Sequence, residues 1–128
     1  MSQPASTTGY GASGTIGTPS QTVATGKYSA GSSFYNRYGD RYALITVVCD
    51  NAFTLTVHGS PPGPSFASVA DTGSAAGALL ATFSGAAAST LEGTAFYVRI
   101  AGMRFVLPVV YQAGGDNAAV TIKYQTFS

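Results

Sequence analysis

The chain has 128 residues, the length of one ordinary domain, and only 9% of them are charged, against about 25% in an average soluble domain. Six Lys+Arg and five Asp+Glu residues give a formal net charge of +1. This charge is too small to neutralise a run of phosphates or to hold an anionic membrane surface, so composition argues against nucleic acid and membrane as partners.

The surface must be nearly uncharged, and a surface of that kind tends to associate. We therefore favour a chain whose neighbours cover part of it over a secreted domain that tolerates this composition. Cys49 is the only cysteine, so no intrachain disulfide is possible, and its apolar surroundings predict a buried, inert thiol. The start, MSQPASTTGYG, lacks the features of a signal peptide, and no apolar stretch reaches the ~18 residues of a membrane-spanning helix.

The first part of the chain is rich in Gly, Ser and Thr and carries no charge before Lys27. Because few aliphatic side chains are present to offset the entropy of ordering, we expect residues 1–30 to form an extended N-terminal arm and 31–128 to form the domain. Deleting residues 2–26 is then expected to leave the domain folded.

The span 21–36 could add one or two weak strands, with Val23, Tyr28 and Phe34 as their buried side chains. The strongest local signal follows, where RYALITVVCD and NAFTLTVHGS form two β-branched runs joined at Asp50-Asn51, a dipeptide that accepts the positive φ of a tight hairpin turn. The second run alternates apolar and polar residues, which indicates one buried face, whereas the first is apolar on both faces, which indicates a central strand.

A long surface loop is expected over 60–77, where three of the six prolines lie. Alanine clusters beside the next segment could nucleate a short helix instead of a strand. Pro108 marks an edge position or a bulge in its strand. The later strands are predicted over 77–85, 95–101, 103–111 and 118–125, the last after the turn QAGGDN. About seven or eight short strands without an amphipathic helix are typical of an antiparallel β-sandwich or jelly roll.

Side chains that could act as general acids, general bases or metal ligands are few. The five carboxylates fall in or beside predicted turns, where Asp is common for backbone reasons: they are Asp40, Asp50, Asp71, Glu92 and Asp116. His58 is the only histidine, and one histidine with one buried cysteine cannot form a zinc site. Calcium at Asp71 is conceivable but lacks the Asp-x-Asp spacing of a loop site. No catalytic, cofactor-binding or metal-binding residue is predicted, and an enzyme is not expected.

Tyrosine is the one enriched side chain with binding character, and its eight copies are Tyr10, Tyr28, Tyr35, Tyr38, Tyr42, Tyr97, Tyr111 and Tyr124. In the segment YNRYGDRY these rings join Arg37 and Arg41. Tyr and Arg bury a large area while keeping a polar handle, so the segment could form a contact patch or stack sugars. It could equally just cover the ends of the sheets.

From about Tyr42 the chain resembles small β-sandwich virion proteins of tailed bacteriophages. In those proteins a hairpin of the ALITVVCDNAFTLTVHGS kind, a Pro/Gly/Ser loop, a strand such as FYVRIAG and a final hairpin like QAGGDNAAVTIKYQ recur in that order. The middle loop departs from the pattern, because this chain has PPGPSF and no tryptophan where the resembling proteins often carry a tryptophan-containing turn.

The resemblance implies a structural virion protein, assembled in the host cytoplasm, that decorates or cements the capsid or belongs to a tail or fibre. Its partners would be further copies of itself or major capsid protein subunits, with the N-terminal arm reaching a neighbour. A second hypothesis is a carbohydrate- or receptor-binding module, in which the loop 60–77 and exposed tyrosines hold a surface glycan.

Overall fold

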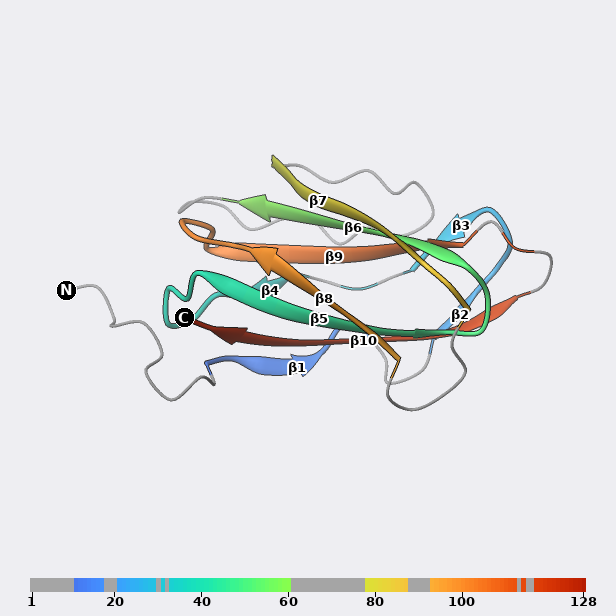
Figure 1. The fold of residues 1–128 in the computed structure, drawn as a ribbon, viewed down its shortest axis with the longest axis horizontal. Coiled ribbons are helices and arrows are strands. Elements are labelled where there is room, and N and C mark those ends of the chain that lie inside the picture. The colour runs from blue at the N-terminus through green and yellow to red at the C-terminus, as the bar shows by residue number, and fades with distance from the viewer. Residues whose placement is uncertain are drawn as a thin grey trace.

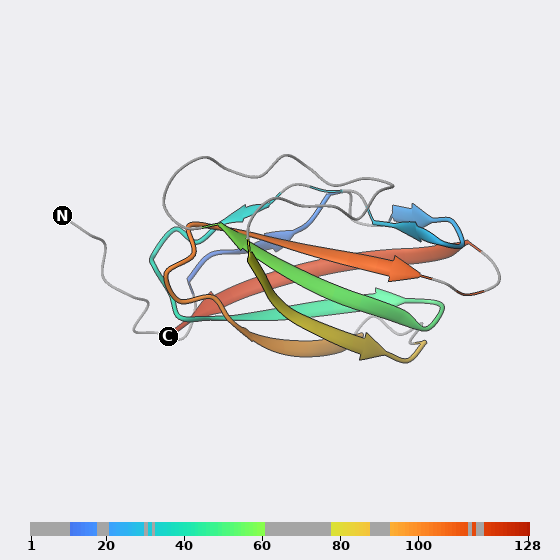
Figure 2. The same cartoon turned by 90° about the horizontal axis from the view of Figure 1, so that it is seen from above.

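The computed structural model describes residues 11–17, 21–29, 31, 33–60, 78–87, 93–112, 114 and 117–128. These residues form two β-sheets packed face to face as two layers (Figure 1; Figure 2 shows them from above). No helix occurs in this part of the chain, and none is therefore long and apolar enough to cross a membrane.

Ten strands make up the two layers: β1 (Ser13–Thr15), β2 (Gln21–Val23), β3 (Lys27–Tyr28), β4 (Phe34–Tyr35), β5 (Tyr42–Cys49), β6 (Phe53–Ser60), β7 (Ala78–Gly85), β8 (Thr94–Arg99), β9 (Phe105–Gln112) and β10 (Ala118–Phe127). Sheet A has the order β1-β10-β5-β8, with β2 also on β10. Sheet B has the order β3-β9-β6-β7, with β4 also on β9. Every pairing is antiparallel, which confirms the predicted antiparallel β-sandwich.

The core lies between the two sheets and follows the alternation of the strands. On β5 every second side chain is fully buried, and on β6 every second residue is buried. The largest side chains without exposed surface include Ile45 and Ile122 from sheet A and Leu55 from sheet B. Strand β5 lies between β10 and β8, so the prediction that the run apolar on both faces is a central strand is confirmed.

The predicted hairpin at Asp50-Asn51 is wrong, because β5 belongs to sheet A and β6 to sheet B. The three residues between them carry the chain from one layer to the other, as Figure 1 shows, and no described residue other than glycine has a positive φ. The final pair, β9 and β10, also lies in two different sheets. The alternation of apolar and polar residues predicts which side chains are buried. A hairpin and a crossing between layers bury the same side chains, so the alternation cannot distinguish the two connections.

The predicted boundary at residue 30 is also displaced, because the sandwich begins earlier. Strands β1 and β2 pair with β10, and β3 pairs with β9. Ile16 and Val23 are each only 3% exposed. Strand pairing supplies backbone hydrogen bonds that a count of aliphatic residues does not reveal, so deleting residues 2–26 would remove β1 and β2 from sheet A. Residues 1–10 of the expected arm lie outside the described residues.

Other predictions fall on single elements. The strand expected over 77–85 is β7, and the described part of the alanine-rich stretch is strand and coil. Pro108 lies inside β9, opposite Val57, and β3 and β4 pair with β9 on either side of it. A proline is tolerated there because neither short strand needs its missing N–H. The loop 60–77 lies outside the described residues apart from Ser60.

Candidate functional site

The outer face of sheet A is the surface on which the chain gathers exposed aromatic and hydrogen-bonding side chains. Residues directly opposite each other on antiparallel strands project to the same face, so the register gives the layout of this surface in rows. Read from β8 across β5 and β10 towards β1, the rows are Arg99–Tyr42–Phe127, then Tyr97–Leu44–Gln125–Ser13, then Ala95–Thr46–Lys123–Thr15.

Three aromatic rings meet at one end of this face, and we call Tyr42, Tyr97 and Phe127 the aromatic triad. The Tyr42 and Phe127 rings are stacked, with 5.6 Å between their centroids and 25° between their planes. The Tyr97 ring meets the Phe127 ring edge-on, with 5.8 Å between the centroids. Tyr97 is 69% exposed, and the other two rings are half-buried. Each ring is fixed by its strand and by its neighbours, so the triad is a preformed aromatic surface open to solvent.

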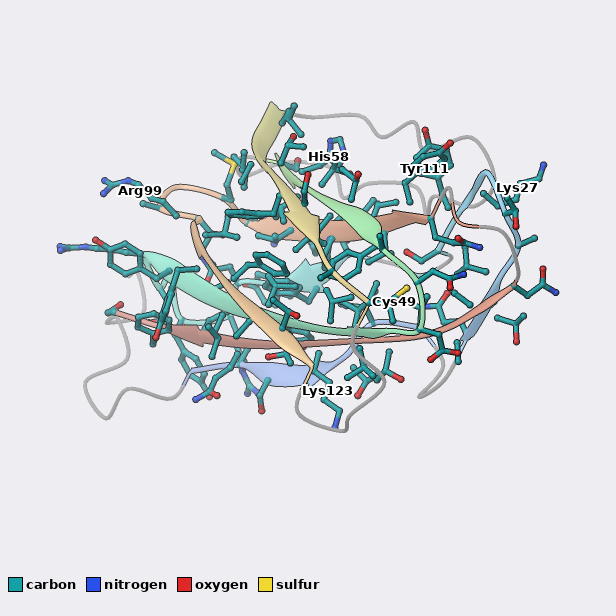
Figure 3. The ribbon with its side chains drawn as sticks, turned by 45° about the vertical axis from the view of Figure 1, so that its right-hand side comes forward. Lys27, Cys49, His58, Arg99, Tyr111 and Lys123 are labelled. Atoms are coloured by element: carbon teal, nitrogen blue, oxygen red, sulfur yellow. The ribbon has the colours of Figure 1, made fainter. Side chains whose placement is uncertain are left out.

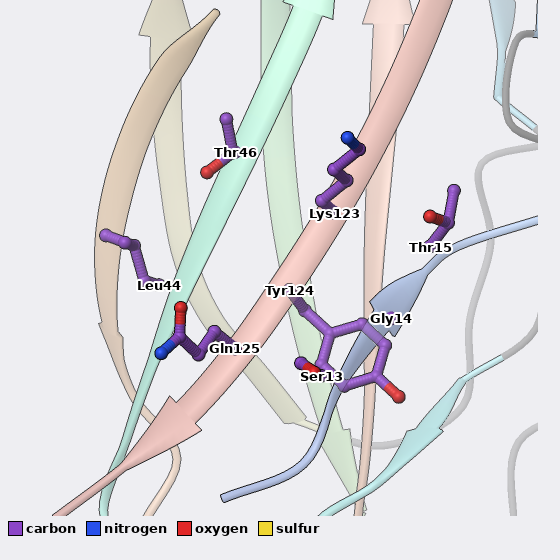
Figure 4. Close-up of a pocket in the computed structure, with 8 residues that line it drawn as sticks. All are labelled: Ser13, Gly14, Thr15, Leu44, Thr46, Lys123, Tyr124 and Gln125. Atoms are coloured by element: carbon purple, nitrogen blue, oxygen red, sulfur yellow. The ribbon is translucent and has the colours of Figure 1, made fainter. Parts of the chain in front are cut away.

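A shallow hollow of about 390 Å³, which we call the sheet hollow, lies next to the triad on β1, β5 and β10. Figure 4 shows its lining, which is Ser13, Gly14, Thr15, Leu44, Thr46, Lys123, Tyr124 and Gln125. Hydroxyl and amide groups dominate this lining, and Lys123 supplies its one charge. The hollow therefore offers mainly uncharged donors and acceptors of hydrogen bonds.

The floor of the sheet hollow depends on Gly14. A Cβ atom at this position would lie 3.1 Å from the Tyr124 hydroxyl oxygen, so the missing side chain leaves room for the phenol. The Tyr124 ring stacks on Phe34 with 3.9 Å between ring centroids, and burial raises the pKa of its hydroxyl. Tyr124 is therefore a fixed, neutral hydrogen-bonding group.

A second hollow of about 330 Å³, which we call the corner hollow, lies on the other side of β1. It shares Ser13 and Tyr124 with the sheet hollow, and its full lining is Gly11, Ala12, Ser13, Tyr35, Arg37, Tyr38 and Tyr124. The guanidinium of Arg37 lies 5.5 Å from the centroid of the Tyr38 ring, within the range of a cation–π contact. This hollow is lined by phenols and one exposed cation.

A buried carboxylate anchors the corner. Asp40 has no exposed surface and accepts hydrogen bonds from the Thr126 hydroxyl at 2.8 Å and the Ser128 hydroxyl at 2.9 Å. The amide of Asn36 donates to the Asp40 carbonyl at 2.9 Å, and its side-chain oxygen accepts from the Asp40 N–H. Asp40 thus ties the segment after β4 to the end of β10, a structural role beyond that of the predicted turn residue.

The structure divides the predicted patch YNRYGDRY between two places. Tyr35, Arg37 and Tyr38 reach the corner hollow, whereas Tyr42 joins the triad. Of the other tyrosines, Tyr97 and Tyr124 belong to these same surfaces, Tyr28 and Tyr111 contact each other on sheet B, and Tyr10 lies outside the described residues. The sequence pattern does not single out Phe127 or the β1 side chains, although the alternation of the last strand places Phe127 on the face of Lys123 and Gln125.

The titratable residues that are described do not converge. Figure 3 shows Cys49 between the sheets, His58 on sheet B and Lys123 on the far side of sheet A. Burial raises the pKa of the Cys49 thiol and lowers the pKa of the His58 imidazole, whose Nε2 lies 3.3 Å from the Thr56 hydroxyl. Asp50 accepts a hydrogen bond from the Ala119 N–H.

No group of three or more His, Cys, Asp or Glu residues that could hold a metal ion occurs in the part of the chain that the structure describes. Asp71, with the calcium site considered for it, lies outside that part, as do Glu92 and Asp116. The described surface presents aromatic rings, hydroxyls, amides and a few cations.

No protein-family model matches the chain, and no curated protein matches it. Among solved structures it is similar to the carbohydrate-binding module CsCBM6-3 from Clostridium stercorarium, solved in complex with cellobiose. The two share 17% sequence identity with a TM-score of 0.42, over 93% of this chain and 88% of that chain. A likeness this distant assigns neither a ligand nor a site to this chain.

Proposed function

We propose that the protein is a binding module that holds a saccharide on the outer face of sheet A. The observation that carries this proposal is the position of the aromatic triad directly beside the sheet hollow. A pyranose ring presents C–H groups on its faces and hydroxyl groups around its rim. The exposed ring of Tyr97 suits the faces, while Ser13, Thr46 and Gln125 suit the hydroxyls.

Preorganisation supports the same proposal. The side chains project from paired strands in fixed rows, and the triad rings already contact one another. Little conformational entropy is then lost on binding, because the rotamers of half-buried Tyr42 and Phe127 are already restricted. A wide, shallow surface of this kind fits a short stretch of a longer saccharide chain better than it fits an enclosed small molecule.

The test is a glycan array followed by a titration of the isotopically labelled protein with the best saccharide, observed by two-dimensional amide NMR. Amide shifts should concentrate on strands β1, β5, β8 and β10, at the rows that contain Tyr97 and Lys123. The amides of β6, which lies in the other sheet, serve as an internal control. Shifts confined to sheet B, or no saccharide bound on the array, would exclude the proposal.

A second candidate is the structural virion role, and the observation that favours it is the edge of sheet B. Among the described strands β7 pairs only with β6, and its sequence ALLATFSG contains neither a charge nor a proline. Leu79 on this strand is 59% exposed. Natural sheets often protect their edges with charged residues or prolines, and an edge strand that lacks them can pair with a strand of another subunit.

Here the partner would be a second copy of the chain or a capsid subunit. Light scattering over a range of concentrations should show a defined oligomer. Thr82→Lys, which places a charge on an exposed position in the middle of β7, should convert it to a monomer. Thr54→Lys, a half-buried position on the paired neighbour β6, is the matched control for surface charge alone. A wild-type protein that stays monomeric throughout would remove this candidate's support.

A further inference from the structure

Three of the chain's six cationic residues lie along the surface that joins the aromatic triad, the sheet hollow and the corner hollow. Arg99 is opposite Tyr42 in the row of the triad, Lys123 lines the sheet hollow, and Arg37 lines the corner hollow. All three side chains are exposed. Each part of the surface therefore carries one positive charge.

Neither of the two described carboxylate side chains is exposed on this surface. Asp40 is fully buried and accepts hydrogen bonds from the hydroxyls of Thr126 and Ser128. Asp50 follows the other end of β5 and accepts from the Ala119 N–H. Among the described residues, this surface therefore carries three exposed cations and no exposed carboxylate side chain.

The cations are spread out rather than clustered. The row from Tyr97 to Ser13 crosses four strands, and three inter-strand spacings of about 4.8 Å give a length of ~14 Å. The corner hollow with Arg37 begins beyond Ser13, which both hollows share. A single small anion could meet only one of these cations, whereas a chain with repeated negative groups could meet several.

We infer that the ligand is an acidic saccharide chain, whose sugar rings lie on the triad and the sheet hollow and whose anionic groups meet Arg99, Lys123 and Arg37. This inference rests on the proposed function and narrows it to a ligand class. The two arginines present planar forks that match a carboxylate or a sulfate, and Arg37 is steadied by its contact with the Tyr38 ring. Lys123 contributes a point charge between them.

The experiment compares matched pairs of oligosaccharides by calorimetry: mannan oligomers with mannuronate oligomers, and cello-oligosaccharides with the same chains oxidised to carboxylates at the primary hydroxyl. Cello-oligosaccharides sulfated at the primary hydroxyl, which carry no carboxylate, distinguish sulfate from carboxylate. The acidic member of a pair should bind more tightly. Its advantage should shrink as salt rises, because the screening length falls from about 10 Å at 0.1 M to about 3 Å at 1 M.

Three single variants, Arg99→Gln, Lys123→Gln and Arg37→Gln, test the three contacts. Each should weaken binding of the acidic oligomer by about two- to five-fold at low salt, the range of an exposed ion pair, and should weaken binding of the acidic oligomer more than binding of the neutral one. Lys27→Gln is the matched control, since Lys27 is an exposed cation on sheet B at the opposite end of the molecule from Arg99 (Figure 3).

The outcomes separate the two proposals. Equal or tighter binding of the neutral members, or variants that act no more than Lys27→Gln, would overturn the acidic ligand while leaving a saccharide-binding module. No binding of any oligomer, neutral or acidic, would overturn both. Binding of the sulfated cello-oligosaccharides alone would keep the anionic ligand and assign sulfate as its charged group.

Discussion

Replacing Tyr97 by alanine tests the proposed saccharide surface most directly. A tyrosine covers about 150–250 Å² when it is fully buried, and Tyr97 is 69% exposed, so about half of that exposed area, the part on one ring face, can be covered by a ligand. That half is ~50–90 Å². At about 25 cal/mol per Å² it is worth about 1.3–2.2 kcal/mol, and Tyr97→Ala should weaken saccharide binding by about 10- to 40-fold.

Calorimetry measures the affinity, and urea denaturation measures whether the fold has survived. Because Tyr97 is mostly exposed, its loss should change the free energy of unfolding by about 0.5 kcal/mol or less. Tyr97→Phe keeps the ring face and should retain most of the affinity. Leu79→Ala is a matched control, since it removes a comparably exposed apolar side chain from sheet B. An unchanged affinity in a folded Tyr97→Ala protein would refute the placement of the ligand on this face.

Three further predictions concern the fold and its buried groups. Thr126→Val removes the hydroxyl that donates to Asp40 and accepts from the Ala12 N–H. This change should lower the free energy of unfolding, measured in urea, by about 2–3 kcal/mol. A loss below about 0.5 kcal/mol would contradict the hydrogen-bond network around Asp40. The folded-state pKa of His58 lies below its unfolded value of 6.5, so the unfolded chain takes up the proton first as pH falls and stability drops from about pH 7.5 downward. In the His58→Gln variant, stability should fall less steeply over that pH range. An equal fall in the variant and the wild type would exclude a contribution from His58. Burial raises the pKa of the Cys49 thiol, so Ellman's reagent should react with it only when the protein unfolds, and rapid reaction of the native protein would show that the thiol is accessible.

The sequence predicts the layers of this fold better than their connections. Val57 and Leu55 alternate with threonines, and β5 is apolar on both faces, so the buried faces and the central strand follow from the local pattern. The pairing partner of each strand does not follow from the local pattern. Joining β5 to β6 as a hairpin or as a crossing between sheets buries the same side chains, and only contacts between distant segments decide between them.

The candidate site was predictable only in pieces for the same reason. The alternation of β8 exposes Tyr97, and the segment around Tyr42 was singled out as a contact patch. The triad also needs Phe127, which the register of β10 against β5 brings beside Tyr42 across more than half of the chain. The hollows need β1, a strand of three exposed residues with no hydrophobic signal of its own, which pairs with β10.

The two functions considered for this chain use different surfaces, which makes them separable. The proposed saccharide surface is the outer face of sheet A, whereas the edge proposed for assembly is β7 in sheet B. A variant at Tyr97 should therefore change saccharide binding, and one at Thr82 should change assembly, because the two side chains are exposed on different sheets. If both variants lose their respective property, the chain is a subunit that assembles through one sheet and presents a glycan-binding face on the other.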